Sequence, residues 1–249
     1  MPIIIKSDDE IAIMREAGSI VARTLQCLVE ELRPGVVEKD LDQIVRREFK
    51  RHGVQPTFLG YHGYPATVCI SINEEIVHGI PGKRVVGDGD VVSLDLGCTH
   101  RGFVADAALT VVVGTPPPRA CELVEVTRGA LEEGIRQARP GNRLGQISHA
   151  IQTYIESRGF GVVREYVGHG VGRQMHEEPQ VPNYGPPEAG PVLKKGMVLA
   201  LEPMVTMGDW HTRQLDDNWT VTTLDGSLAA HFEHTIAITD GQAEVLTVP

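Results

Sequence analysis

The order of predicted elements along this 249-residue chain repeats once, and this repeat limits the possible folds more than any other feature. Two segments with apolar residues at helical spacing come first, and short β-rich segments follow them. A second pair of helical segments and a second β-rich stretch complete the chain. Arg33-Pro34-Gly35, which stops the first helical segment, recurs 106 residues later as Arg139-Pro140-Gly141. We therefore expect a single α+β domain built from two similar halves, roughly residues 1–115 and 116–249.

Capping and turn residues mark the expected ends of the helical segments. Ser7 and Glu10 form a predicted capping box at the start of the first helix. Gly53 ends the second helix, and Gly159 ends the fourth. The Pro-rich patches at 116–118 and 184–187 are expected to be loops, the first of which would join the two halves.

Charge and composition exclude several classes of partner. A formal net charge of −10 repels phosphate backbones, so direct readout of nucleic acid is not expected. No run approaches the roughly 20 apolar residues of a membrane span, and we expect no signal peptide before the first helix. The four cysteines are scattered without a CxxC pair, which suits a reducing compartment. We expect a cytoplasmic protein without a membrane partner.

Two carboxylates stand at the ends of otherwise apolar, strand-like runs. Asp95 lies in VVSLDLG and Glu202 lies in MVLALEPMV, at nearly equivalent points of the two halves. Burying an ionised carboxylate is costly unless it is paired or bound to a metal. Because the placement occurs twice, we expect a partner cation in a cleft where the two halves face each other.

Further acidic candidates lie near these two runs. Asp106 follows Asp95 by eleven residues, beyond the turn-like CTHRG, so two strands joined there would place the aspartates side by side. Either aspartate alone could also be an ordinary turn or strand residue. Glu233 opens the apolar strand HTIAIT, and its neighbours His231 and His234 are possible metal ligands by residue type.

Three histidines occur in glycine-rich or turn-like surroundings. His169 lies in VGHGVG, where the glycines permit close approach of a ligand but also suit a simple turn. His176 lies in MHEEP and His78 in IVHGIP, and each alone would be an ordinary loop histidine.

A ligand set of several carboxylates with one imidazole is typical of sites for Mn²⁺, Fe²⁺, Co²⁺ or Zn²⁺ and differs from a zinc site formed by thiolates. Such acids can bridge two ions about 3.5–4 Å apart, which activate water and polarise a carbonyl or phosphoryl group. The chain contains no GxSxG, no P-loop and no GxGxxG after a strand, so no competing catalytic motif stands out.

In this order the motifs resemble the bacterial type I methionine aminopeptidases of the pita-bread metallopeptidase family. The resemblance is carried by LDLG, VADAA, GHGVGRQMHEEP, ALEPM and FEHT, and by GYHGYPATVCISINEEIVHGIPG, and it covers essentially the whole chain. It implies the pita-bread fold, with a curved, mostly antiparallel sheet and a dinuclear site between pseudo-symmetric helix-helix-strands halves. It also implies a set of metal ligands. Asp95 would bind the first metal, Asp106 and Glu233 would bridge both, and His169 and Glu202 would complete the second.

The activity implied by the resemblance is removal of the initiator methionine from nascent chains whose second residue is small and uncharged. A metal-bound water would attack the scissile carbonyl, and Glu202 would shuttle the proton. His78 and His176 would bind the scissile region and stabilise the tetrahedral intermediate. The methionine pocket would contain Tyr61, Tyr64, Cys69, Met175 and Trp219. Phe58 and Met175 depart from the residues frequent in the family, which leaves the detailed shape of the pocket open.

The resemblance further implies a monomer that binds N-terminal methionine peptides and associates transiently with the ribosome. Two divalent ions are expected as cofactors, and Co, Mn, Fe and Zn remain open as their identity. Two alternatives are a proline-directed aminopeptidase of the same fold and a non-catalytic binding module that has lost the site. The second alternative predicts missing ligands, whereas all five candidates are present.

Overall fold

The computed structural model describes residues 2–249. The helices are α1 (Asp8–Glu31), α2 (Glu38–His52), the 3₁₀ helix η1 (Tyr61–Gly63), α3 (Pro118–Gln137) and α4 (Leu144–Glu156). The strands are β1 (Gln55–Pro56), β2 (Cys69–Ile72), β3 (Glu75–Val77), β4 (Val91–His100), β5 (Phe103–Val112), β6 (Gly161–Val162), β7 (Gly168–Gly170), β8 (Glu177–Val181), β9 (Val198–Leu201), β10 (Met204–Thr206), β11 (Thr212–Gln214), β12 (Val221–Thr223), β13 (Ala229–His231), β14 (Glu233–Ala237) and β15 (Glu244–Val245). The predicted order, two helices then strands and again two helices then strands, is confirmed.

Local sequence explains where the helices begin and end. Ser7 accepts a hydrogen bond from the Glu10 amide, and the Glu10 carboxylate accepts one from the Ser7 amide, as the predicted capping box requires. Gly53 ends α2 in the left-handed region at φ 67°. The prediction of a loop through Pro118 was wrong, because α3 begins at that residue. Proline fits the first turn of a helix, where its missing N–H has no intrahelical partner.

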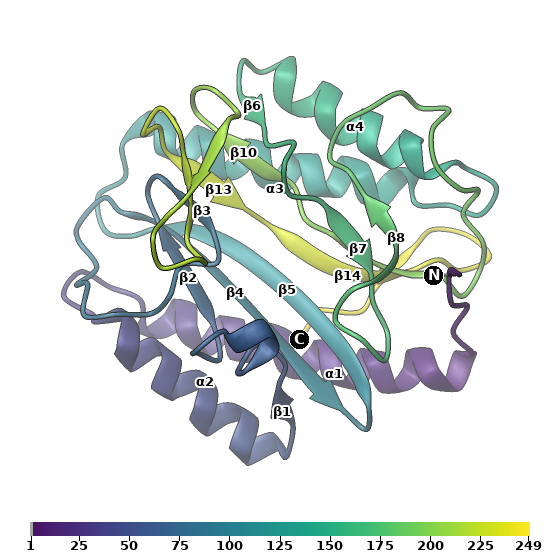
Figure 1. The fold of residues 1–249 in the computed structure, drawn as a ribbon, viewed down its shortest axis with the longest axis horizontal. Coiled ribbons are helices and arrows are strands. Elements are labelled where there is room, and N and C mark those ends of the chain that lie inside the picture. The colour runs from purple at the N-terminus through teal and green to yellow at the C-terminus, as the bar shows by residue number, and fades with distance from the viewer. Residues whose placement is uncertain (1) are drawn as a thin grey trace.

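One large antiparallel sheet joins the two halves. Its strand order is β1-β4-β5-β14-β9-β7-β8, with β2 paired to β4 and β15 paired to β14. The strands β4 and β5 come from the first half, whereas β14 and β9 come from the second. The pairing of β5 with β14 therefore places the middle strands of the two halves side by side across the centre of the molecule (Figure 1).

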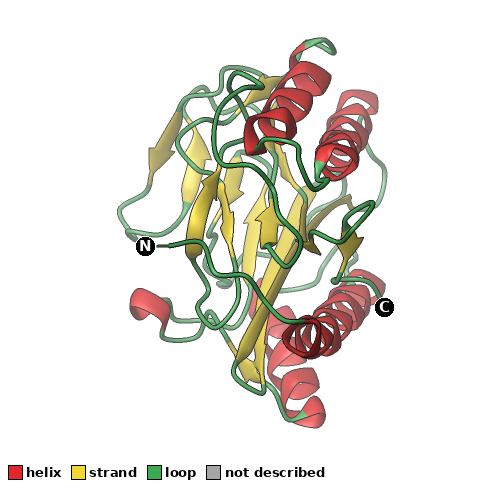
Figure 2. Ribbon diagram, turned by 90° about the vertical axis from the view of Figure 1, so that its right-hand side faces the viewer, coloured by secondary structure: helices red, strands yellow, loops and turns green. Residues whose placement is uncertain are grey.

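The helices cover one face of this sheet, and Figure 2 shows both helix pairs on the same side. Apolar residues of α1 and α2 pack with those of β2, β4 and β5, while α3 and α4 pack with β9 and β14. The short helix η1 lies on the opposite side (Figure 2). None of the helices within residues 2–249 is long and apolar enough to cross a membrane.

Three local predictions near the site need correction. Asp95 is not at the end of its strand, because β4 continues to His100 and pairs with β5 along its whole length. The predicted turn CTHRG shortens to Arg101-Gly102, whose positive φ values of 49° and 81° suit a two-residue hairpin turn. His169 lies on strand β7 rather than in a loop.

Candidate active site

Three adjacent strands place three carboxylates on one face of the sheet. Ala108 of β5 lies opposite Asp95 of β4 on one side and opposite Glu233 of β14 on the other. Residues directly opposite each other in a sheet point to the same face. Asp106 precedes Ala108 by two residues and therefore shares that face. Ala108 has a small side chain, so the space above it is available to the carboxylates of Asp95 and Glu233.

The residue opposite Asp106 is Gly97. A Cβ atom at this position would lie 3.2 Å from Asp106 Oδ1 and 3.2 Å from an edge atom of Phe58. The glycine therefore leaves room for the Asp106 carboxylate. On the other side, Thr235 Oγ1 accepts from the Asp106 amide at 3.0 Å and donates to its carbonyl at 2.8 Å, which fixes the main chain of Asp106.

The second half adds Glu202 and His169. Glu202 directly follows β9, and its carbonyl accepts a hydrogen bond from Asn183 Nδ2 at 3.0 Å. His169 Nδ1 lies 3.0 Å from the Gly170 carbonyl. A carbonyl only accepts, so Nδ1 carries the proton and Nε2 presents a lone pair, 3.5 Å from Glu202 Oε1. This is the tautomer that a metal-binding histidine needs.

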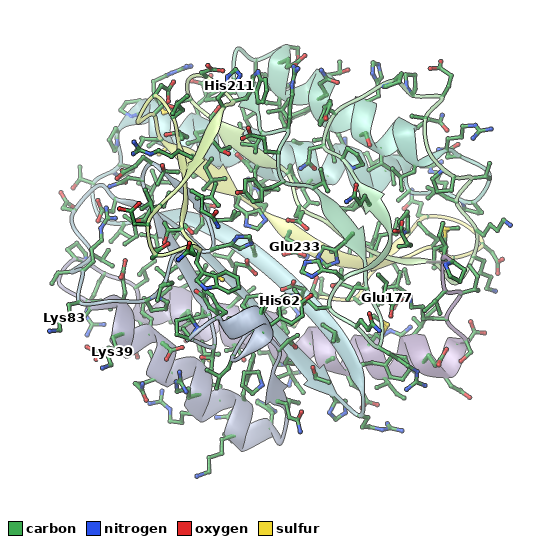
Figure 3. The ribbon with its side chains drawn as sticks, in the orientation of Figure 1. Lys39, His62, Lys83, Glu177, His211 and Glu233 are labelled. Carbon is green, nitrogen blue, oxygen red and sulfur yellow. The ribbon has the colours of Figure 1, made fainter. Side chains whose placement is uncertain are left out.

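The carboxylates are buried too closely together to stay charged without a counterion. Burial, and secondarily the charge of Asp106, raises the pKa values of Asp95, Glu202 and Glu233 well above their usual range. Burial raises the pKa of Asp106 to about 7. Among residues 2–249, no lysine or arginine lines the cavity that contains these acids. Figure 3 shows Glu233 near the middle of the molecule, whereas Lys39 and Lys83 lie at its edge.

The arrangement fits divalent metal ions. Within the described chain, Asp95 Oδ1, Asp106 Oδ1 and Glu233 Oε1 are buried without a hydrogen-bond partner. Asp106, His169 and Glu233 each offer one ligand atom, and these three atoms lie within 4.8 Å of one another. Burial lowers the pKa of His169 to about 3, so its imidazole is neutral and able to bind a metal. Carboxylate oxygens with an imidazole nitrogen form the donor set that such ions prefer.

A cavity of about 370 Å³ opens above the carboxylates, and its lining includes every ligand and pocket residue that the resemblance implied. Its lining consists of Phe58, Tyr61, His62, Tyr64, Cys69, His78, Asp95, Asp106, His169, Met175, His176, Glu202, Trp219 and Glu233. The acids and His169 line one part, and aromatic and sulfur-containing side chains supply the apolar part. His62 was missed, although it stands next to Tyr61 in the GYHGYP motif used for the resemblance.

Tyr64 anchors the aromatic part of the lining. Its hydroxyl donates to the carbonyl of Gly79 at 2.8 Å, and the carbonyl of Val68 lies 3.1 Å from the same oxygen. The ring meets Trp219 edge to face, with centroids 5.0 Å apart. A buried tyrosine whose hydroxyl is paired in this way gives the pocket a fixed apolar surface.

His78 and His176 line the cavity together with His169. His176 Nδ1 lies 2.7 Å from the Tyr61 hydroxyl, and its ring centroid lies 4.3 Å from that of His169. Burial, and secondarily the charge on His176, lowers the pKa of His78 to about 4. Burial also lowers the pKa of His176. At neutral pH His78 is therefore uncharged and able to donate a hydrogen bond.

The two histidines beside Glu233 lie differently. His234 Nδ1 bonds Thr247 Oγ1 at 2.7 Å, and the residue does not line the cavity. His231 Nε2 lies 4.0 Å from Glu202 Oε2, and neither ring nitrogen has a hydrogen-bond partner within the described chain. The structure thus distinguishes His231, which lies near Glu202, from His234, which points away from the site, although the sequence made both possible ligands.

Comparison with known proteins agrees with this geometry. The model of metallopeptidase family M24 matches residues 12–240. Methionine aminopeptidase 1 of Bacillus subtilis is 54% identical over 245 residues, which are 98% of this chain and 99% of that protein. The methionine aminopeptidase of Clostridium acetobutylicum is 51% identical, over 99% of each chain. This chain belongs to the methionine aminopeptidases of family M24.

Solved structures place this M24 chain in the same fold. The methionine aminopeptidase of Thermotoga maritima superposes with a TM-score of 0.98 at 50% identity, and all of both chains is covered. The prolidase of Pyrococcus horikoshii superposes with a TM-score of 0.80 at 27% identity, over 98% of this chain and 63% of that one. The pita-bread fold predicted from the motifs is confirmed. As a member of this family, the enzyme depends on divalent metal ions.

Proposed function

We propose that this M24 enzyme removes the N-terminal methionine from peptides whose second residue is small and uncharged. The proposal is supported best by the position of the buried acids, which lie in the same cavity as an apolar, sulfur- and aromatic-lined surface. An unbranched thioether such as methionine fits such a surface. Nascent chains would be the substrates, and the enzyme would act as a cytoplasmic monomer that meets the ribosome transiently.

Five residues would hold two divalent ions. Asp95 would bind the first ion, Asp106 and Glu233 would bridge the pair, and His169 and Glu202 would complete the second. The bound ions would supply Lewis-acid chemistry, activating a water and polarising the scissile carbonyl. The partnerless oxygens of Asp95, Asp106 and Glu233 support this assignment.

Glu202 would move the proton. Its carboxylate is buried beside Asp106, and this surrounding favours the protonated form more than water does. One Glu202 oxygen would accept the proton of the attacking water, and the same carboxyl group would return it to the leaving amine. The bond from Asn183 to the Glu202 carbonyl keeps this residue in place between the two steps.

His78 and His176 would hold the scissile peptide group. Both line the cavity with the acids, and a neutral imidazole can donate a hydrogen bond to the oxygen that becomes negative in the tetrahedral intermediate. Tyr61 would orient His176 through the 2.7 Å contact between its hydroxyl and Nδ1. Tyr64, Cys69 and Trp219 would enclose the methionine side chain, and Phe58 and Met175 would shape the remaining wall.

The specificity is tested with peptides and controlled metal loading. Metal-loaded protein should release methionine from Met-Ala-Ser and hardly at all from Met-Lys-Ser, and dialysis against a chelator should abolish release until Mn²⁺ or Co²⁺ is added. Glu233→Ala should remove activity, whereas Glu244→Ala, which alters an exposed ion pair with Arg15, should not. Equal cleavage of both peptides would contradict the specificity. Preferential cleavage of an Ala-Pro peptide would instead favour the proline-directed alternative.

A further inference from the structure

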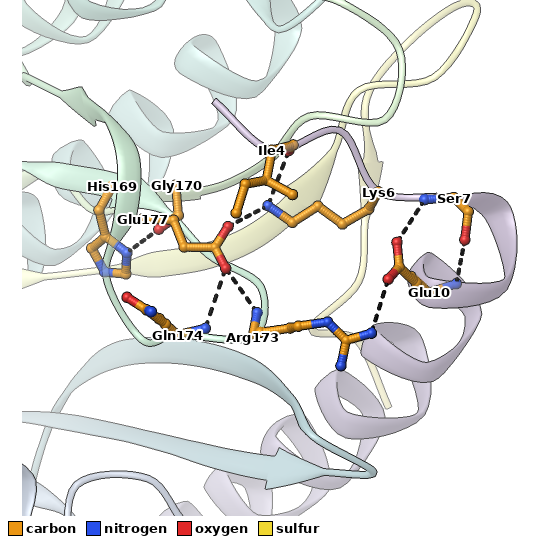
Figure 4. A network of polar contacts seen from close by, with 9 residues as sticks. All are labelled: Ile4, Lys6, Ser7, Glu10, His169, Gly170, Arg173, Gln174 and Glu177. Atoms are coloured by element: carbon orange, nitrogen blue, oxygen red, sulfur yellow. Dashed lines mark hydrogen bonds and ion pairs between the residues drawn. The ribbon is translucent and has the colours of Figure 1, made fainter. Parts of the chain in front are cut away.

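A buried ion pair links the segment before α1 to the first residue of β8, which directly follows the loop of residues 171–176 between β7 and β8 (Figure 4). Lys6 Nζ lies 2.7 Å from Glu177 Oε2, and the two side chains are only 3% and 5% exposed. The partners are 171 residues apart in sequence. Long charged side chains are seldom buried unless they are paired. The pair therefore connects two distant parts of the chain at one fixed point.

The Glu177 carboxylate also organises the loop that precedes it. Its Oε1 accepts hydrogen bonds from the main-chain amides of Arg173, at 2.8 Å, and Gln174, at 3.2 Å. A Cβ at Gly172 would lie 2.5 Å from Lys6 Cε and 2.6 Å from Glu177 Oε1, so the loop backbone packs directly against the pair. The loop thus folds around one carboxylate whose other oxygen is held by Lys6.

Lys6 is itself held in place by its surroundings. Its amide donates to the Gly196 carbonyl at 2.8 Å, and its Nζ also donates to the Ile4 carbonyl at 3.2 Å. The next residue, Ser7, caps α1. The ammonium group is therefore positioned by the start of a 24-residue helix and not by a flexible tail.

The loop delivers two side chains to the cavity, because Met175 and His176 both line it. We propose that Lys6 and Glu177 are positioning residues whose ion pair fixes this loop and so places His176 against the scissile group and Met175 in the pocket wall. The inference rests on the proposed function, since it assigns no new reaction. It predicts that the segment before α1, which does not line the cavity, controls turnover.

A second link, between the same loop and the first turn of α1, provides a matched control. Arg173 Nη2 lies 3.2 Å from Glu10 Oε1, but these side chains are 65% and 30% exposed. Exposed ion pairs contribute little to stability. Replacing the Arg173 side chain leaves its main-chain amide free to bond Glu177. Arg173→Gln therefore removes the exposed link and keeps the buried one.

The test uses Lys6→Met, Glu177→Gln, the double variant and Arg173→Gln, each loaded with Mn²⁺. We expect each single variant at the buried pair to lose about tenfold or more in kcat for Met-Ala-Ser, because a small misplacement of a group that holds the scissile bond is costly. Each leaves a buried group without its partner, so its melting temperature should fall. The double variant removes both charges and should regain melting temperature, but its kcat should stay low because no ion pair then ties the loop to the segment before α1. Arg173→Gln should remain within twofold of wild type.

Hydrogen exchange of the 171–177 segment gives a readout independent of activity. The main-chain amides of Arg173 and Gln174 should exchange faster in the double variant than in wild type, with metal content unchanged. Recovery of kcat together with melting temperature in the double variant, or unchanged exchange of these amides, would overturn the proposal. If wild type released no methionine, the proposed function would fail, and the exchange measurement would still decide whether the pair orders the loop.

Discussion

In the metal-free protein, the contribution of the Asp106 carboxyl group to the free energy of unfolding should decrease as the pH rises. Burial raises the pKa of this group from 3.8 to about 7. Between these pH values the folded protein keeps a proton that the unfolded chain releases, so this stabilising contribution is fully present below about pH 4 and lost by about pH 7. At 1.36 kcal/mol per pH unit, the loss amounts to about 4 kcal/mol.

This pH dependence must be separated from that of the buried histidines, whose contributions to stability increase as the pH rises. Burial lowers the pKa of His78 and of His234 to about 4, so their contributions to stability are present above about pH 6.5 and are lost as the pH falls towards 4. The informative quantity is therefore the difference in unfolding free energy between wild type and Asp106→Asn at each pH. That variant keeps the shape of the side chain and cannot ionise.

Urea unfolding of chelator-treated protein, followed by tryptophan fluorescence at several pH values from about 4.5 to 7.5, measures this difference. The stability of wild type relative to Asp106→Asn should decrease by about 3 kcal/mol over this range, because part of the full effect already falls below pH 4.5. Adding Mn²⁺ or Co²⁺ should remove most of the decrease, because the ion compensates the negative charge. A difference that stays constant with pH in the metal-free protein would refute the reasoning.

Three further variants test individual contacts. Tyr61→Phe removes the 2.7 Å contact to His176 Nδ1 and should lower kcat/KM by about two- to tenfold, with metal binding unchanged by calorimetry; an unaltered kcat/KM would exclude an orienting role. Gly97→Ala places a Cβ 3.2 Å from Asp106 Oδ1 and should weaken divalent-ion binding about tenfold; wild-type affinity in the same titration would contradict this. Thr235→Val removes both hydrogen bonds to the Asp106 main chain and should cost about 1–3 kcal/mol in urea unfolding, a loss that would be absent if those bonds were dispensable.

Sequence patterns were sufficient for features that depend on local spacing. The capping box of Ser7, the end of α2 at Gly53 and the strand beginning at Glu233 all follow from short-range rules, and the structure has them. The acids could be selected because charged residues within apolar runs need partners. The repeat of the sequence predicted a shared cleft for Asp95 and Glu202, and the motif resemblance then assigned all five ligands to one site.

Features that depend on register and distant contacts could not be predicted. The placement of Asp95 and Glu233 on either side of Ala108 requires the β4-β5 hairpin of the first half to pair with β14 of the second half. The ion pair between Lys6 and Glu177 joins residues with no pattern that relates them. Such contacts are set by tertiary packing and become visible only in the folded chain.

Methionine release measured against bound metal is the most direct test of the central claim, that the buried acids and His169 form a metal-dependent aminopeptidase site. Metal-free protein is titrated with Mn²⁺ or Co²⁺ while bound metal and release of methionine from Met-Ala-Ser are followed in the same sample. Release should rise with bound metal, stop on chelation and be nearly absent with Met-Lys-Ser. Bound metal without methionine release, or release that persists in excess chelator, would contradict the account.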